Sequence, residues 1–286
     1  MKIIKYFFQF IIIYVFFILF KIVGYKLSTN IGAILGRLIG PLTRSKKIIL
    51  KNLETALPNL KEEEKEKIIH NMWANYGQIL SNYVYIKDFY NSKLDKFIKI
   101  EGLEILSSVR NSNQPVVFVS GHFNNFELMA MHLTKSNINL AAIYRPLNNI
   151  FLNKVMEKIR KNYICRNQIK KGLSGVRQIF KLLKKNHSIA LMIDQRVSQG
   201  ISSNFFGKPS LTTTIPAQLV KRFNCKVVPI HIEKYKKYHF KITVSEPIKF
   251  EEKENIKNIT SKLNILLEKM ILKNPDQWIW SHNRWK

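Results

Sequence analysis

The 286-residue sequence predicts an α/β protein, a layered αβα sandwich around a mixed, mostly parallel sheet, preceded by one N-terminal membrane helix. Two observations lead to this prediction. Beyond about residue 95, short apolar runs typical of buried strands alternate with segments whose apolar residues recur at helical spacing. Ahead of them, residues 6–25 form an almost unbroken apolar run. Strands separated by helices favour a layered sheet with right-handed crossovers.

The N-terminal run has the length and composition of a membrane anchor. Residues 6–20 are all apolar or aromatic except Gln9. Roughly 20 helical residues at ~1.5 Å rise span the ~30 Å hydrocarbon core of a bilayer. No small-x-small cleavage site follows, as a secretory signal peptide would require. We therefore expect an anchor over residues 1–26, which either crosses the bilayer once or, because Lys5, Gln9 and Lys21 shorten the span, lies in its interface.

The formal net charge of +28 favours anionic partners: nucleic acid, anionic lipid headgroups or an acidic protein. No helix-turn-helix, zinc finger or aromatic RNA platform is legible, so we expect a membrane lipid and no nucleic acid. Basic residues are more numerous after the anchor than before it, which by the positive-inside rule places the rest of the chain in the cytoplasm. Cys165 and Cys225 are far apart and the histidines lack ligand spacing, so we expect no disulfide, metal or other cofactor.

Residues 27–286 are expected to form one domain, with a helical part over residues 27–90 and an α/β part over residues 91–286. In the helical part Pro58 interrupts the helical spacing. Strands are expected in KFIKIEG, PVVFVSG, INLAAIY, SIALMID, KVVPIHI and HFKITVS. Helices are expected in NNFELMAMHL, NNIFLNKVMEKIRK, VRQIFKLLKK, PAQLVKRF and residues 255–273. Residues 205–207 and 212–216 are predicted to form a loop that leads into a helix.

The segment PVVFVSGHFNNFELMA carries the candidate chemistry. A strand that ends near Ser120 places His122 in a loop at its carboxyl end, where ligands of α/β sheets collect. His122 and Glu127 meet only if His122 precedes the helix and Glu127 lies in its first turn. The helix N-terminus then keeps the imidazole neutral, and Glu127 orients it as a general base. By spacing alone, a helix cap and an ordinary loop histidine are the better interpretation, because an H-x4-E spacing is a weak signal.

Several blocks of the sequence resemble the lipid A late acyltransferases, the lauroyl/myristoyl branch of the H-x4-D/E acyltransferases. GHFNNFELMA is similar to that family's GHFGNWE block, although Asn124 stands where the family usually has Gly and Phe126 where it has Trp. Further similar blocks follow in the family's order: IYRPLNNIFLNKVMEKIR, LMIDQRVSQG, FFGKPSLTTTIPAQLVKRFNCKVVPIHI and NPDQWIWSHNRWK. Since the upstream RSKKIILKNLETALPNL fits too, the resemblance covers nearly the whole chain.

The resemblance implies a glycerol-3-phosphate-acyltransferase-like fold and a specific reaction. A fatty acyl chain would move from an acyl carrier protein thioester to a hydroxyl of a lipid A precursor, an anionic lipid of the bacterial inner membrane. His122 would be the general base and Glu127 its partner. The alternatives are acylation of another polar lipid, such as a lysophospholipid or glycolipid, and a non-catalytic basic membrane protein.

The resemblance also implies substrate-binding residues. Arg145 follows a predicted strand and is expected to bind phosphate or sugar of the acceptor. The family pairs an arginine with the aspartate of its DQ block, here Asp194, and Arg160 and Arg166 compete for that role, with Arg166 preferred. Asp194 ends an apolar strand, where a carboxylate needs a partner, and Gln195 is expected to face the same cleft. The C-terminal tryptophans are interpreted as packing residues.

Overall fold

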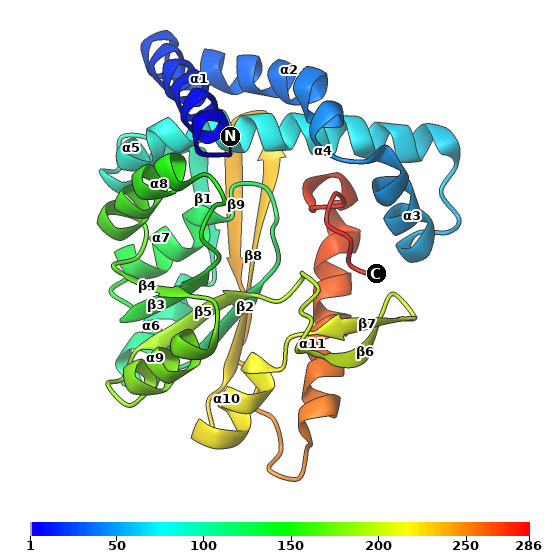
Figure 1. The fold of residues 1–286 in the computed structure, drawn as a ribbon. Helices are drawn as coiled ribbons and strands as arrows, with labels where there is room; N and C mark the ends of the chain where they lie inside the picture. Colours follow the sequence, from blue (N-terminus) through cyan, green and yellow to red (C-terminus); the bar gives the residue numbers. More distant parts are fainter. Residues whose placement is uncertain (1) are drawn as a thin grey trace.

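A seven-stranded sheet forms the centre of the computed structural model, which describes residues 2–286 apart from the side chain of Leu173. Its strands are β1 (Ile98–Glu101), β2 (Val117–Ser120), β3 (Leu140–Tyr144), β4 (Asn167–Lys170), β5 (Ser188–Met192), β8 (Val227–Lys236) and β9 (His239–Val244). They lie in the order β1-β9-β8-β2-β5-β3-β4 (Figure 1). The pairing is parallel throughout except between β8 and β9.

Helices flank this sheet. After the N-terminal part they are α6 (Leu103–Asn111), α7 (Glu127–Lys135), α8 (Ile150–Tyr163), α9 (Leu173–Leu183), α10 (Ile215–Phe223) and α11 (Ile256–Lys273), with two single 3-10 turns, η2 (Asp95–Phe97) and η3 (Pro275–Gln277). β2 is buried along its whole length, as expected for a central strand covered on both faces. The predicted fold class, α/β with a mixed and mostly parallel sheet, is confirmed.

The N-terminal part is helical. It consists of α1 (Lys2–Val23), α2 (Tyr25–Thr43), α3 (Lys46–Ala56), α4 (Glu62–Asn82), η1 (Tyr83–Tyr85) and α5 (Ile86–Tyr90). The break around Pro58 falls between α3 and α4. Among residues 2–286, α1 is the helix that is long and apolar enough to cross a membrane. Of the anchor expected over residues 1–26, Met1 lies outside the described residues.

The loop predicted over residues 205–207 and 212–216 is only partly correct: residues 213–214 lead into α10, but residues 205–207 and 212 belong to a hairpin. Residues 201–212 form a separate antiparallel hairpin of β6 (Ile201–Phe205) and β7 (Lys208–Thr212). Its two-residue turn, Phe206 and Gly207, has positive φ at both positions, 51° and 70°. Such a turn matches the right-handed twist of the two strands. The sequence did not predict this turn because phenylalanine is an unusual residue at a position with positive φ. A hydrogen bond from Phe206 N–H to Glu268 Oε1 at 2.7 Å stabilises the turn.

Candidate active site

The register of the sheet brings His122 beside Asp194. β2 and β5 are parallel neighbours, and Ser120 of β2 pairs with Met192 of β5. His122 and Asp194 each follow their paired strand residue by two positions. The two residues therefore lie side by side at the carboxyl edge of the sheet, where α/β folds bind their ligands.

Asp194 holds His122 through two contacts. His122 Nδ1 lies 2.8 Å from Asp194 Oδ1, and the backbone N–H of His122 donates to Asp194 Oδ2 at 2.7 Å. Trp278 Nε1–H donates to the same Oδ2 at 2.9 Å. The Asp194 side chain is 0% exposed and that of His122 is 23% exposed. With Nδ1 held as a donor to the carboxylate, Nε2 is left to accept a proton.

This environment raises the pKa of His122. Burial disfavours the imidazolium, but the charge of Asp194 and the hydrogen bond to it outweigh burial, and the charge of Glu127 adds to them. Burial alone would raise the pKa of Asp194, yet the contacts with His122 and Trp278 lower it. The effect expected of the helix N-terminus, which favours the neutral ring, is therefore opposed by the buried carboxylate, which favours the protonated ring.

Glu127 is the first residue of α7, and His122 precedes that helix, as the geometry of the motif requires. Its partner, however, is Arg160 of α8. Arg160 Nε and Nη2 donate to Glu127 Oε1 at 2.7 and 2.5 Å, and the two side chains are 12% and 9% exposed. The expected hydrogen bond from a ring N–H of His122 to the Glu127 carboxylate is absent among residues 2–286, and Nδ1 lies beside Asp194 instead. Glu127 influences the ring through its charge instead.

The expected pairing of Asp194 with an arginine is also corrected. Within the described residues Asp194 bonds to His122 and Trp278. Arg166 is exposed and immediately precedes β4, at the amino edge of the parallel strands, opposite the edge that carries Asp194. The preference for Arg166 over Arg160 was wrong because sequence order alone does not tell which edge of a sheet a loop residue occupies.

Two cations lie where β3 and β4 end. Arg145, exposed, directly follows β3, and Lys171 directly follows β4, with its backbone N–H donating to Tyr144 O at 2.9 Å. Burial and the nearby charge of Arg145 lower the pKa of Lys171. Gln195, half-buried, follows Asp194 at the same edge. Lys171 was missed by sequence reasoning, because only the pairing of β3 with β4 places it beside Arg145.

The C-terminal segment, residues 274–286, ties together the two loops of the site. Gln277 O accepts the backbone N–H of Asn124 at 3.0 Å. His282 Nε2 accepts the backbone N–H of Arg196 at 3.1 Å, and Trp278 bonds to Asp194 between them. The interpretation of Trp278 as a packing residue is thus incomplete. It is fully buried against Trp280, and its indole N–H also fixes the carboxylate of the site.

Asn124 occupies a backbone position that favours glycine. Its φ is 34°, in the region that asparagine tolerates better than most residues. The side chain is buried, with Nδ2 lying 3.3 Å from Asn75 Oδ1 and Oδ1 accepting the N–H of Asn125 at 2.8 Å. The next departure, Phe126, packs edge-on against the His122 ring at 4.9 Å between centroids. Both substitutions therefore support the loop without displacing the base.

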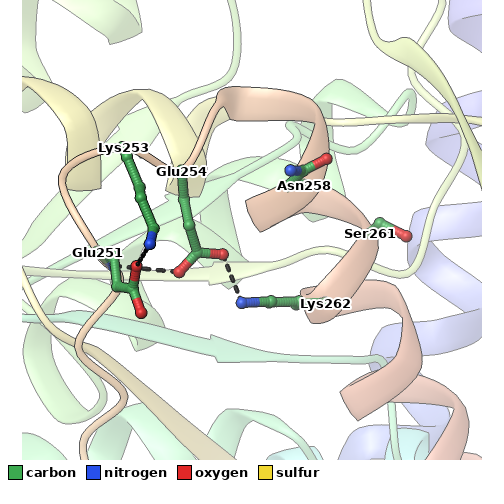
Figure 2. Close-up of a pocket in the computed structure, with 6 residues that line it drawn as sticks. All are labelled: Glu251, Lys253, Glu254, Asn258, Ser261 and Lys262. Carbon is green, nitrogen blue, oxygen red and sulfur yellow. Dashed lines mark hydrogen bonds and ion pairs between the residues drawn. The ribbon is translucent and has the colours of Figure 1, made fainter.

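A hollow in the surface lies at the start of α11, and it differs from the site around His122 (Figure 2). Its charged residues neutralise one another: Lys262 Nζ lies 2.5 Å from Glu254, and Lys253 Nζ lies 3.0 Å from Glu251. The hollow includes the first two turns of α11, and the remaining 11 residues of that helix separate Lys262 from the C-terminal segment, a length of ~16 Å. It is a solvated surface feature remote from His122.

A histidine held by a buried carboxylate, with its second nitrogen free at the carboxyl edge of a mostly parallel sheet, has the arrangement of a general base. The chain belongs to the bacterial lipid A biosynthesis acyltransferases, since the model of that family matches residues 1–286. The predicted enzyme class, acyltransferase, is thus confirmed.

Named relatives agree with this assignment. The chain is similar to the lipid A biosynthesis palmitoleoyltransferase of Escherichia coli, with 28% identity over 92% of this chain and 86% of the relative. It is similar to a lipid A biosynthesis acyltransferase of Haemophilus influenzae, with 26% identity over 92% and 85%. The lipid A biosynthesis myristoyltransferase of Escherichia coli shows 24% identity over 89% and 80%.

Proposed function

We propose that this protein transfers a fatty acyl chain from an acyl carrier protein thioester to a hydroxyl of a lipid A precursor, with His122 as general base. The observation that carries the proposal is the His122–Asp194 pair, which leaves Nε2 free at the carboxyl edge of the sheet. Asp194, rather than Glu127, is assigned as the residue that orients the ring and stabilises its protonated form.

The reaction needs no nucleophile from the enzyme. The acceptor hydroxyl oxygen attacks the thioester carbonyl carbon while Nε2 of His122 takes the hydroxyl proton. The tetrahedral intermediate then collapses, the carbon–sulfur bond breaks, and the leaving thiolate takes the proton back from His122. Ester and thiol are released, and the enzyme returns to its starting state.

Glu127 and Arg160 are proposed to act on the acyl carbonyl. The bonds to Glu127 use Nε and Nη2 of Arg160, and we propose that Nη1 donates to the substrate oxygen. Burial on its own would lower the pKa of Arg160, but the charge of Glu127 outweighs it and the pKa is raised, which keeps the guanidinium charged. A fixed cation beside His122 would stabilise the oxyanion that forms during attack.

Arg145 and Lys171 are proposed to bind a phosphate of the acceptor, with Gln195 contacting its polar headgroup. Two neighbouring cations at one edge of the site suit a dianionic group, since a phosphate relieves the repulsion between them. The acidic carrier protein and the anionic acceptor both complement a chain of net charge +28. Lipid A precursors are membrane lipids, so we place the protein at the inner membrane with its catalytic domain on the cytoplasmic side.

The proposal is tested with membranes that contain the protein, labelled acyl carrier protein thioester and a panel of acceptors. We expect label in a lipid A precursor, and transfer at least ~10²-fold slower by His122→Ala. Transfer to lysophosphatidate or a glycolipid instead of every lipid A precursor would replace the acceptor. Transfer from acyl coenzyme A but not from the carrier protein would replace the donor, and transfer by His122→Ala at close to the wild-type rate would overturn the mechanism.

A further inference from the structure

The helix α1 is attached to the protein at both ends. Near its start, Asn149 Nδ2 donates to Tyr6 O at 2.8 Å, and the Phe151 ring packs on Phe7 at 5.5 Å between centroids. Near its end, the Tyr85 hydroxyl donates to Phe20 O. Fifteen or so residues, ~22 Å of helix, therefore rest on the protein surface. α1 does not project away from the domain.

The two faces of α1 differ in exposure rather than in polarity. The inner face, which includes Phe17 and Phe20, packs into the core. The outer face consists of exposed apolar side chains at helical spacing: Ile4, Phe8, Ile11, Val15, Ile18 and Ile22. An aqueous surface does not favour this outer face.

These contacts are incompatible with a helix that crosses the bilayer. A spanning α1 would have to be surrounded by ~30 Å of hydrocarbon. Its inner neighbours would then enter the hydrocarbon, including Asn149 at the first end and Asp88, which pairs with Lys21, at the second. Charged groups at that depth are strongly disfavoured. A helix lying along the membrane keeps every contact and buries its outer face.

The helix α2 presents a second apolar face on the same side of the molecule. Its glycines pack closely on α4: a Cβ on Gly36 would lie 2.1 Å from Trp73 O, and one on Gly40 would lie 2.3 Å from the Trp73 ring. Residues two positions away point about 200° around the helix. Leu38 and Leu42 therefore face outward, and they are 67% and 85% exposed. Figure 1 shows α1 and α2 together at one end of the molecule, above α4.

Basic residues border the second face. A cavity of about 190 Å³ between α2, α3 and α4 is lined by Arg37, Arg44 and His70, and also by Glu66, which pairs with Lys46. Arg37 and Arg44 are exposed, and within residues 2–286 no carboxylate lies within the 4.0 Å of an ion pair from either guanidinium. Exposed arginines without an ion-pair partner, beside an exposed apolar helix, suit the headgroup phosphates of anionic lipids.

We propose that α1 and the outer face of α2 form one apolar platform that lies in a single leaflet of an anionic bilayer, with Arg37 and Arg44 at the headgroup phosphates. The attachment thus extends beyond residue 26 to Leu42. α4 links this platform to the site, because it packs on α2 on one side and its Tyr76 hydroxyl bonds to Ser281 of the C-terminal segment at 3.0 Å. The inference deepens the membrane location proposed above and does not depend on the catalytic assignment.

Topology labelling tests the platform without any activity measurement. Native Cys165 and Cys225 are buried, so single cysteines can be introduced in the full chain at two exposed ends, as Lys2→Cys and Lys286→Cys. A membrane-impermeant maleimide is applied to intact spheroplasts and to inside-out vesicles. We expect both positions to react from the same face of the membrane. Reaction of Lys2→Cys from the face opposite to Lys286→Cys would show a spanning helix and overturn the proposal.

Lipid contact of α2 is tested separately. Leu42→Cys carries an environment-sensitive fluorophore in protein bound to phosphatidylglycerol vesicles that contain brominated lipid. We expect quenching at least twofold stronger than for the control Leu103→Cys on α6, which is also exposed. Arg37→Gln with Arg44→Gln should weaken the quenching in phosphatidylglycerol and leave it unchanged in neutral vesicles. Equal quenching at Leu42 and Leu103 would show that α2 does not enter the leaflet. A catalytically inactive protein gives the same readouts.

Discussion

Two hydrogen-bonded pairs that each contain a carboxylate lie within the site, and they are assembled differently. The His122–Asp194 pair joins two loops at the ends of neighbouring strands, so the register between β2 and β5 sets its geometry. The Glu127–Arg160 pair joins two helices, α7 and α8. Glu127 lies five positions after His122 in the sequence, and Asp194 lies 72 positions after it.

The comparison shows that nearness in a motif does not identify a hydrogen-bond partner. The loop after β2 places His122 beside the end of the neighbouring strand β5, and the carboxylate that contacts its Nδ1 is that of Asp194. Glu127, at the start of a helix, faces the guanidinium of α8 instead. One pair is therefore suited to moving a proton and the other to holding a fixed positive charge.

Loss of the base is expected to have the largest effect. His122→Ala should lower kcat by ~10²–10⁴-fold, because no other group at the site can take the hydroxyl proton. Partly exposed His187→Ala serves as the control and should retain full activity. The measurement is the initial rate of acyl transfer at saturating thioester. A drop of less than tenfold in His122→Ala would remove His122 from the reaction.

Breaking the second pair should affect both folding and activity. Glu127→Gln leaves the Arg160 charge buried without its partner, and removal of one member of a buried pair costs ~3–5 kcal/mol of unfolding free energy. Chemical denaturation measures this loss, with Arg160→Gln and the double variant completing a cycle. If Glu127→Gln and the double variant have the same free energy of unfolding as the wild type, the pair makes no contribution to the stability of the fold.

A cross of the two pairs separates their roles in catalysis. In a His122→Ala background, Asp194→Asn should cost almost no further activity, because it acts through the histidine. Glu127→Gln should still lower the residual rate in that background, because it acts through Arg160. The reverse pattern would restore Glu127 as the residue that orients His122.

The pH profile sharpens the assignment of Asp194. His122 works when it is neutral, so the rate should fall as pH drops through its pKa, which the Asp194 carboxylate raises. Asp194→Asn removes that charge and leaves the opposing effect of burial. The pKa of His122 then falls, and the acid limb of kcat moves to lower pH while kcat itself drops by roughly 10²-fold. A limb that stays in place would show that Asp194 does not set the basicity of His122.

A smaller effect is expected at Trp278. Trp278→Phe removes the indole N–H that donates to Asp194 Oδ2 and keeps most of the buried ring. A lost hydrogen bond to a charged group is worth ~1.5–3 kcal/mol at most, so we expect a decrease in kcat of about tenfold. Trp285→Phe is the matched control, since its indole N–H donates to Phe205 O, away from the site. Equal losses in the two variants would indicate a general packing effect.

The smallest effect is expected in the hollow of Figure 2. Lys262→Ala breaks an exposed ion pair with Glu254, and pairs of this kind contribute little because water screens them. Acyl transfer should be unchanged within error. A clear loss of activity would mean that this surface contacts a substrate, for example the carrier protein, and would extend the site beyond the carboxyl edge of the sheet.

Much of the fold was predictable because it depends on local patterns. Every strand expected from an apolar run is present, since β-rich apolar runs bounded by turn residues leave few other structures open. The place of His122 before a helix and of Glu127 at its start followed from helix geometry. The β6–β7 hairpin was missed because its turn relies on Phe206 in a left-handed conformation, for which the sequence gives no warning.

The sequence by itself determined the elements, the excess of positive charge, the apolar N-terminal helix and the loop histidine that precedes α7. Only the tertiary structure decided which carboxylate holds that histidine, that Lys171 joins Arg145, and that Trp278 reaches Asp194. The physical reason is that periodicity and capping act over a few residues, whereas strand order and register join residues that are tens of positions apart. The partner of His122 is set by the order of strands in the sheet, and no pattern within its own motif records that order.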